Sequence, residues 1–238
     1  MGLPTGEIER VVSDQRHAAL SRVGNRLHLT LEALESDDET PTELVRHEID
    51  LIVGPNVVIT IHEGPIKALA RFSERVDAGE TLIGALDAVD LMSSLTDAVF
   101  AGYFETVERI QREIDELDER ALRGRRDDDV LQALVDVRRR VGLVRRTLAP
   151  HREVMAALAR PEMRVEETIG IPWSGLGDRL EHAMEAVEGL RDSLIGTYDI
   201  HMGRAAPWRG TARYDVRPSS AAYRHAARPW RRPATSRA

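Results

Sequence analysis

The chain has 238 residues, of which 42% are hydrophobic but only 4% aromatic, so its core must consist mainly of aliphatic side chains. It contains no Cys, which excludes disulfides, thiolate metal sites and cysteine nucleophiles. The net charge is −7, yet residues 204–238 contain nine Arg and one Asp and carry +8, which leaves −15 on the preceding residues. The sequence therefore predicts an acidic body with a basic C-terminal tail.

No segment has the features of an export signal or a membrane span. Residues 1–10 lack the apolar core of a signal peptide. No run approaches the roughly 18–20 apolar residues that a transmembrane helix needs. The most apolar window, residues 51–61, is short and is interrupted by a Gly-Pro-Asn sequence. A cytoplasmic location is therefore expected for the chain as written.

The N-terminal third is expected to form a small, mainly antiparallel sheet of at least three strands. Residues 1–24 are polar, with one short helix expected near residues 7–12. Residues 27–34 (LHLTLEAL) alternate in polarity, which predicts a strand that places its leucines at 27, 29 and 31 on one face. Two further strands, at residues 44–53 and 57–62, are predicted to be joined by the Gly-Pro-Asn turn.

The remainder of the chain is expected to be helical up to Arg204. The predicted helices cover residues 66–77, 81–122, 130–149, 152–159 and 173–204. Two of them, 81–122 and 130–149, are expected to form a long antiparallel hairpin, and Pro150 is expected to interrupt the chain after it. The fold class is therefore α+β: a small, mainly antiparallel sheet followed by a long helical hairpin and a long stalk-like helix.

The last predicted helix carries two stripes of residues. Apolar residues recur in steps of three and four and so share one face, which predicts a packing seam. They are Leu176, Leu180, Met184, Val187, Leu190, Leu194 and Tyr198. The second stripe is acidic and comprises Asp178, Glu181, Glu185, Glu188 and Asp192. Because the periodicity stops after Arg204, we expect three parts: residues 1–80, 81–204 and a basic, disordered tail at 205–238.

Five segments in order along the chain match short motifs that occur together in one protein family. They are residues 14–17 with 23–27 (DQRH, VGNRL), 51–63 (LIVGPNVVITIHE), 95–104 (LTDAVFAGYF), 113–119 (EIDELDE) and 146–154 (RTLAPHREV). In the same order, they are similar to QRPKVE-x-Y-x-x-Y, FLGPNYLVTVHE, LLDALVDRYF, EIDELEE and RRALAPQREVL. No single motif is decisive, but their order and spacing are specific. Together they resemble the cytoplasmic part of the CorA family of divalent-cation transport proteins.

The resemblance implies a funnel-shaped cytoplasmic domain, a stalk helix, two membrane helices and a pentameric pore in the bacterial plasma membrane. The transported ion would be Mg²⁺ or Co²⁺, with Zn²⁺ as an alternative. Residues 173–204 match the stalk, which in the family continues into the first membrane helix and a Gly-Met-Asn signature. Here an Arg follows Gly203, and neither the span nor the signature is present. The tail resembles the product of a shifted reading frame in a GC-rich gene, with natural truncation as the alternative.

The acidic stripe is a candidate regulatory Mg²⁺ site, because Mg²⁺ prefers carboxylate and water oxygens. In a parallel bundle, stripes on neighbouring chains would repel one another, and a divalent cation would offset that repulsion. The resemblance implies intersubunit sites of this kind, although the family's stalk Asp falls at Gly175 here. The candidate ligands in this chain are Asp178, Glu181, Glu185, Glu7 and Glu9. The alternative is a solvated acidic face with no metal role.

Two other arrangements of charged residues leave alternatives open. The acidic residues within 105–119 are expected either to meet complementary charge across the hairpin or to collect cations. The arginines expected to face them are Arg138, Arg139, Arg140, Arg145 and Arg146. His182 and Glu185 lie three residues apart on one helix and could ligate zinc only together with a third residue.

The sequence contains no recognisable Ser-His-Asp arrangement, phosphate loop or pair of catalytic acids, so no enzymatic activity is expected. The tail is expected to be out-of-frame sequence, with binding of RNA or of an anionic membrane surface as the alternative. The sequence favours the cytoplasmic regulatory domain of a CorA-like Mg²⁺/Co²⁺ transporter. It would form homo-oligomers and bind divalent cations, but no specific nucleic acid and no small-molecule substrate. The alternative is a soluble helical interaction protein or a non-functional truncated remnant.

Overall fold

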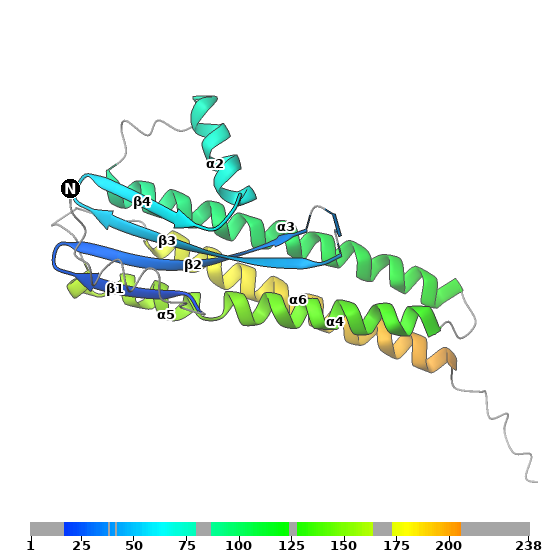
Figure 1. Ribbon diagram of the computed structural model, residues 1–238. Helices are drawn as coiled ribbons and strands as arrows, with labels where there is room; N and C mark the ends of the chain where they lie inside the picture. The colour runs from blue at the N-terminus through cyan, green and yellow to red at the C-terminus, as the bar shows by residue number, and fades with distance from the viewer. Residues whose placement is uncertain are drawn as a thin grey trace, which may run out of the picture. The chain divides into compact units, whose positions relative to one another are not determined.

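The computed structural model describes residues 17–37, 39–40, 42–79, 87–123, 128–163 and 173–205, which all belong to one compact unit. The strands are β1 (Ala19–Val23), β2 (Arg26–Ser36), β3 (Leu44–Gly54) and β4 (Val57–His62). The helices are α2 (Lys67–Asp77), α3 (Ala88–Arg123), α4 (Asp128–Leu148), α5 (His151–Leu158), the short 3-10 helix η2 (Pro161–Met163) and α6 (Trp173–Ala205). A small antiparallel sheet followed by long helices confirms the predicted α+β class (Figure 1).

The sheet has the order β1-β2-β3-β4, and each strand is antiparallel to its neighbour in the sequence. Pro55 and Asn56 form the predicted turn between β3 and β4. The three leucines expected on one face of β2, Leu27, Leu29 and Leu31, are at most 1% exposed and belong to a core that includes the helices. The three predicted strands are therefore confirmed.

Strand β1 is a fourth strand that the sequence pattern did not indicate. Its five residues, ALSRV, show no clear alternation of apolar and polar side chains. It pairs with β2 from Ala19 opposite Thr30 to Val23 opposite Arg26. Gly24 has a φ of 61° in the connecting turn, a conformation that glycine adopts without steric cost. Pairing with β2 and contact with α5 therefore stabilise β1, and neither is visible in a local pattern.

The long helix α3 contains 36 residues and spans about 54 Å at 1.5 Å per residue. The Asp87 carboxylate accepts hydrogen bonds from the backbone N–H groups of Val89 (2.9 Å) and Asp90 (2.7 Å). These bonds make Asp87 the N-cap of a helix that begins at Ala88. The prediction that one helix runs through Asp87 is therefore wrong, and its predicted start at Thr81 lies outside the described residues.

The interruption predicted at Pro150 is confirmed, because α4 ends at Leu148 and α5 begins at His151. In Figure 1, α3, α4 and α6 lie side by side, and α6 contacts both of the other two helices. One hydrophobic core extends from the sheet through these helices. The domain boundaries expected at residues 80 and 204 stay predictions.

The predicted packing seam of α6 is buried from Leu176 to Leu194 but does not continue to Tyr198. Tyr198 is 44% exposed, so its assignment to the seam is wrong. Thr197 and His201 are buried instead, because steps of three and four from Leu194 bring these positions inward. Among the described helices, none combines the length and the apolar composition of a membrane span.

Candidate functional site

The acidic stripe of α6 lies on the side of the helix away from the packing seam. We call this stripe the acidic face; it comprises Asp178, Glu181, Glu185, Glu188 and Asp192. All of these side chains are exposed except that of Glu188, which is partly buried. The 3.6-residue period separates them from the buried leucines, because the two sets occupy different positions in each turn. The structure thus presents the predicted carboxylates on a single outward surface.

Glu181 is already paired within the chain. The Arg152 guanidinium of α5 donates two hydrogen bonds to it, and the bond from Nε to Oε1 measures 2.8 Å. These bonds lower the pKa of the Glu181 carboxyl, so the side chain stays ionised in mildly acidic solution. The pair links α5 to α6, but it is exposed and screened by water and therefore contributes little to the stability of the fold.

Glu188 is engaged in a similar way by two arginines. Arg145 of α4 lies 3.1 Å from its Oε1, and Arg191 of α6 lies 3.3 Å from its Oε2. Positive charge therefore neutralises two of the five carboxylates of the acidic face, and those two have fewer free oxygens for a cation.

The other three carboxylates, Asp178, Glu185 and Asp192, have no hydrogen bond or ion pair to any described residue. They follow one another at intervals of seven residues, which corresponds to about 10.5 Å along the helix. One ion cannot bridge such a distance, and no group of three or more potential ligands occurs in the described part of the chain. No described residue adds a further ligand to these carboxylates, so a cation at any of them would need ligands from outside the described residues or contact through its water shell.

The remaining predicted ligands lie partly outside the described residues. Glu7 and Glu9 lie outside the described residues, and their role stays a prediction. His182 and Glu185 are both exposed on α6, and no third ligand joins them among the residues described. Gly175 is exposed at the start of the acidic face and carries no ligand atom in its side chain.

The complementary charge expected across the α3–α4 hairpin is largely absent from the described residues. Arg140 pairs with Glu113, and both side chains are partly shielded. Arg139 instead pairs with Asp136 of its own helix, and Arg145 pairs with α6. The prediction was wrong for these two arginines. It considered only their position along the helix axis, but the direction in which a side chain points around the axis also decides which neighbour it contacts.

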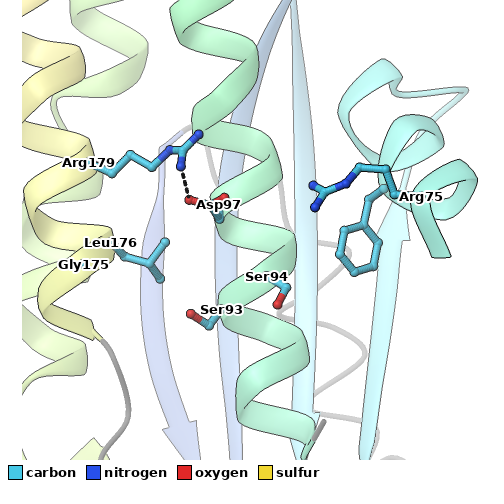
Figure 2. A pocket seen from close by; sticks show the side chains of 8 residues that line it. Arg75, Ser93, Ser94, Asp97, Gly175, Leu176 and Arg179 are labelled. Carbon is cyan, nitrogen blue, oxygen red and sulfur yellow. Dashed lines mark ion pairs between the residues drawn. The ribbon is translucent and has the colours of Figure 1, made fainter. Parts of the chain in front are cut away.

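One ionic contact, between α3 and α6, was not predicted from the sequence pattern. Arg179 lies 3.1 Å from Asp97 and 5.8 Å from the centre of the Phe104 ring. It borders a cleft of about 400 Å³ with Arg75 on the opposite wall (Figure 2). Among the described residues that line this cleft, two are arginines and one, Asp97, is a carboxylate, which is a poor arrangement for binding a cation.

Comparison with known proteins supports the assignment made from the motifs. The sequence profile of the family described as "CorA-like Mg2+ transporter protein" matches residues 1–206. The chain is 29% identical over 168 residues to "Cobalt/magnesium transport protein CorA" of Thermotoga maritima, a match that covers 69% of this chain and 47% of the relative. It is 30% identical over 143 residues to "Divalent cation transporter CmaX" of Pseudomonas aeruginosa, covering 58% and 41% respectively.

The fold is similar to that of the soluble domain of CorA from Methanocaldococcus jannaschii, with a TM-score of 0.71 at 15% identity over 85% of this chain and 80% of that one. The matches to the two sequence relatives span less than half of those proteins' lengths. The family profile, in contrast, covers most of this chain and ends at residue 206, within two residues of the end of α6. The chain therefore belongs to the CorA-like Mg²⁺ transporter family.

Proposed function

We propose that this chain is a regulatory, cation-responsive part of a CorA-like transporter for Mg²⁺ or Co²⁺, with Zn²⁺ as the alternative ion. The family assignment and the names of the relatives support divalent cations as the cargo. The observation that carries the regulatory role is the set of three exposed, unpaired carboxylates on the outward side of α6. A divalent cation would act between copies of the chain, because a single copy does not bring these carboxylates together.

The proposed regulation follows from simple electrostatics. When copies of α6 pack in parallel, their acidic faces come close to one another and repel. Mg²⁺ is attracted to such a surface and, because it usually keeps several waters, it does not need a preformed cage of protein ligands. Cation binding would therefore favour the assembled state, and loss of the cation would loosen it.

The same helix carries exposed apolar side chains that would suit self-association. Ile195, Tyr198 and Met202 are 43–49% exposed, and their spacing of three and four residues places them on one side of α6. Large apolar side chains grouped in this way are typical of interaction surfaces. They support a homo-oligomer, and the family resemblance favours a pentamer.

The first test measures the mass of the full chain by sedimentation with and without 10 mM Mg²⁺ at constant ionic strength. We expect Mg²⁺ to tighten self-association about tenfold, which corresponds to about 1.4 kcal/mol. The triple variant Asp178→Asn, Glu185→Gln, Asp192→Asn should associate without Mg²⁺ and lose the response, because the repulsion is absent.

A matched control removes the same three charges elsewhere on exposed helix surfaces, at Glu74, Glu116 and Glu153. This control should keep the Mg²⁺ response of the wild-type chain. If the wild-type chain stays monomeric at every Mg²⁺ concentration, the regulatory proposal is wrong, and a soluble interaction protein or an inactive remnant becomes the better interpretation.

A second test concerns the apolar surface of α6. Tyr198→Asp should weaken self-association by at least about tenfold, since it places a charge in the proposed contact. It should change the free energy of unfolding of the monomer by about 0.5 kcal/mol or less, because the side chain is exposed. Leu122→Asp on α3, where the leucine is 52% exposed, is the control and should leave association unchanged. Equal effects of both substitutions would argue against a specific α6 contact.

A further inference from the structure

One edge of β2 is bound in part by side chains instead of by a neighbouring strand. Strand β1 pairs with β2 only as far as Thr30, whereas β2 continues to Ser36. Beyond that pair, the backbone N–H of Glu32 donates to Nε2 of His151 at 3.2 Å, and its carbonyl accepts from the Tyr103 hydroxyl at 2.7 Å. Helices α5 and α3 thus satisfy backbone groups that a longer β1 would bind.

The fully buried His151 ring joins several parts of the fold. His151 is the first residue of α5, and its ring packs against Phe100 and Tyr103 of α3. Its Nδ1 donates to the carbonyl of Leu148, the last residue of α4, at 3.1 Å. Because Nε2 accepts the bond from β2 and Nδ1 donates to α4, these contacts require the neutral ring with its proton on Nδ1.

Among the described residues, the ring has no charged partner. Next to its contacts, the elements packed around it carry several ionisable side chains: Tyr103 of α3, Glu32 of β2, Arg145 and Arg146 of α4, Arg152 and Glu153 of α5, and Glu181 of α6. No ion pair joins the ring to any of these or to another described residue, and Glu32 and Glu181 are each bound to an arginine instead. A protonated ring would therefore be a buried charge without a partner, which is unfavourable.

Protonation of the ring would remove one specific contact. It places a proton on Nε2, which then faces the backbone N–H of Glu32, so that two donors meet and neither has an acceptor. The neighbouring bond from Tyr103 to the Glu32 carbonyl stays in place, because burial raises the pKa of Tyr103 and keeps its hydroxyl protonated. The contact that is lost is therefore the one between α5 and β2, whereas α3 stays attached to β2.

We propose that protonation of His151 detaches α5 from the edge of β2 while the rest of the domain stays folded, so that this junction is a pH-sensitive switch. Helix α5 is suited to such a movement because it has only eight residues and follows the interruption at Pro150. Apart from His151, its buried residues are Val154, Met155 and Leu158. A short helix with few buried side chains can separate locally at a lower cost than the long helices can.

Detachment of α5 also changes the acidic face of α6. Arg152, which follows the buried ring in the sequence, donates two hydrogen bonds to Glu181 of α6. When α5 separates, Glu181 loses this partner, and the acidic face gains a carboxylate without an ion pair. A proton taken up inside the fold is thereby communicated to an outer surface, and the switch does not require that this surface bind a cation.

Amide hydrogen exchange of the full chain at pH 7 and pH 5 tests the switch. Burial lowers the pKa of His151 from 6.5 to about 4, so the opening constant of α5 and of the Glu32 amide should rise about twentyfold, after correction for intrinsic exchange. These amides should exchange faster than those of α3 and respond little to low urea, since local opening exposes little surface. If they exchange only together with the most protected α3 amides, protonation unfolds the whole domain and the proposal is overturned.

His151→Gln identifies the group that is responsible, because its amide oxygen can accept the Glu32 N–H and does not titrate. The α5 opening constant of this variant should be the same at both pH values, whereas His182→Gln, at an exposed position, should keep the twentyfold rise. Titration of the Glu32 carboxyl has the opposite sign, because burial raises its pKa. A rise that persists in His151→Gln rejects the switch.

Nitrogen-15 NMR of the histidine rings gives a further test that does not depend on the folding of any variant. In the wild-type chain at pH 7, the ring of His151 should carry its proton on Nδ1 and none on Nε2. A proton on Nε2 at pH 7 would show that His151 does not accept the Glu32 N–H, and the switch would then be rejected.

Discussion

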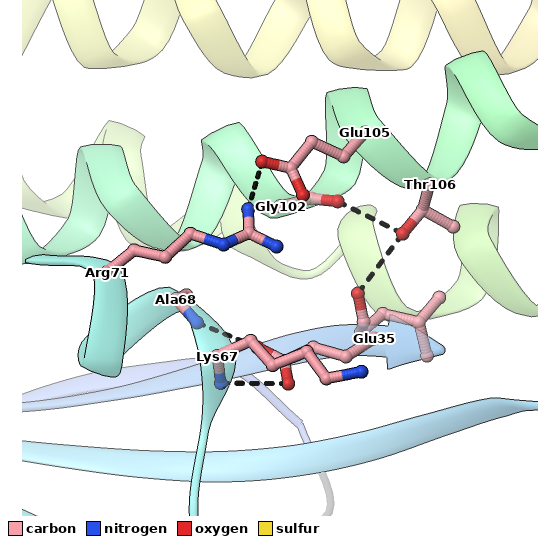
Figure 3. Close-up of polar contacts among 8 residues, drawn as sticks. Glu35, Lys67, Ala68, Arg71, Gly102, Glu105 and Thr106 are labelled. Carbon is pink, nitrogen blue, oxygen red and sulfur yellow. Dashed lines mark hydrogen bonds and ion pairs between the residues drawn. The ribbon is translucent and has the colours of Figure 1, made fainter. Parts of the chain in front are cut away.

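Glu35→Ala is expected to destabilise the domain by about 3 kcal/mol and to release the start of α2. Glu35 is on β2, is 8% exposed, and binds the backbone N–H groups of Lys67 and Ala68 at 3.0 and 2.9 Å. Ile66, which occupies the N-cap position of α2, offers no side-chain hydrogen bond. The first turn of this helix is therefore capped by a residue that lies more than thirty positions earlier in the sequence (Figure 3).

The effect should be large because α2 has few other attachments. Only Ala68 and Phe72 of this helix are buried, so its apolar contacts cannot compensate for two backbone donors that lose a charged acceptor. Hydrogen bonds to charged groups contribute about 1.5–3 kcal/mol each. Chemical denaturation should report the global loss, and amide hydrogen exchange should show the largest loss of protection in α2.

Two comparisons define the cause of this effect. Glu35→Gln keeps one acceptor oxygen and should lose about half as much stability. Glu105→Gln removes an exposed ion pair with Arg71 at the same junction and should cost no more than about 1 kcal/mol. If Glu35→Ala left α2 protected, the interpretation of Glu35 as the cap of α2 would be wrong.

The second large effect concerns pH: the free energy of unfolding should fall by about 2 kcal/mol between pH 7 and pH 5 because of His151. His151 is 0% exposed. Its Nδ1 donates to the Leu148 carbonyl at 3.1 Å, and its Nε2 accepts from the Glu32 backbone N–H at 3.2 Å. Phe100 and Tyr103 pack against the ring edge-on, with centroids 5.4 and 6.2 Å away. These contacts fit the neutral ring.

The loss of stability at lower pH follows from the lowered pKa of His151. Burial lowers the pKa of His151 from 6.5 to about 4 in the folded chain. Between these values the unfolded chain binds a proton that the folded chain does not, so acidification favours unfolding. The contribution of neutral His151 to the free energy of unfolding is fully present above pH 6.5, and its loss is complete near pH 4. Most carboxylates titrate below pH 5, so the interval between pH 7 and pH 5 reports mainly on histidine.

His151→Gln is the informative variant, because the amide oxygen of Gln can accept the Glu32 N–H and the side chain does not titrate. Its unfolding free energy should vary much less between pH 7 and pH 5 than that of the wild-type chain. His182→Gln makes the same change at an exposed position of α6 and should keep the wild-type pH profile. A His151→Gln profile parallel to that of the wild type would contradict the assignment.

Local sequence patterns predicted much of the fold. Alternation identified β2, and a Pro-Asn turn between β-branched runs identified the β3–β4 hairpin. Helical periodicity identified α3, α4 and α6. The exceptions depend on contacts between residues far apart in the sequence. Strand β1 forms because it pairs with β2. Thr197 is buried instead of Tyr198 because of the way α6 packs against its neighbours.

The candidate site was predictable in its position but not in its pairing. Spacing alone placed the acidic stripe away from the buried leucines of α6. It could not show that Arg152, 29 residues earlier, would occupy Glu181, or that Arg145 would reach Glu188. The Arg179–Asp97 contact between α6 and α3 was missed for the same reason, since partners far apart in sequence leave no shared pattern.

The burial pattern of α6 has a mechanical consequence. Its 33 residues extend over about 50 Å, but its fully buried apolar side chains end at Leu194, and beyond that point the described buried residues are Thr197 and His201, with Ile200 partly buried against the core. The stretch from Leu176 to Leu194 is held by buried side chains, whereas the last turns have fewer buried contacts. About 17 Å of helix lies between Leu194 and residue 205, so a tilt of about 5° at Leu194 would displace the end of α6 by roughly 1.5 Å.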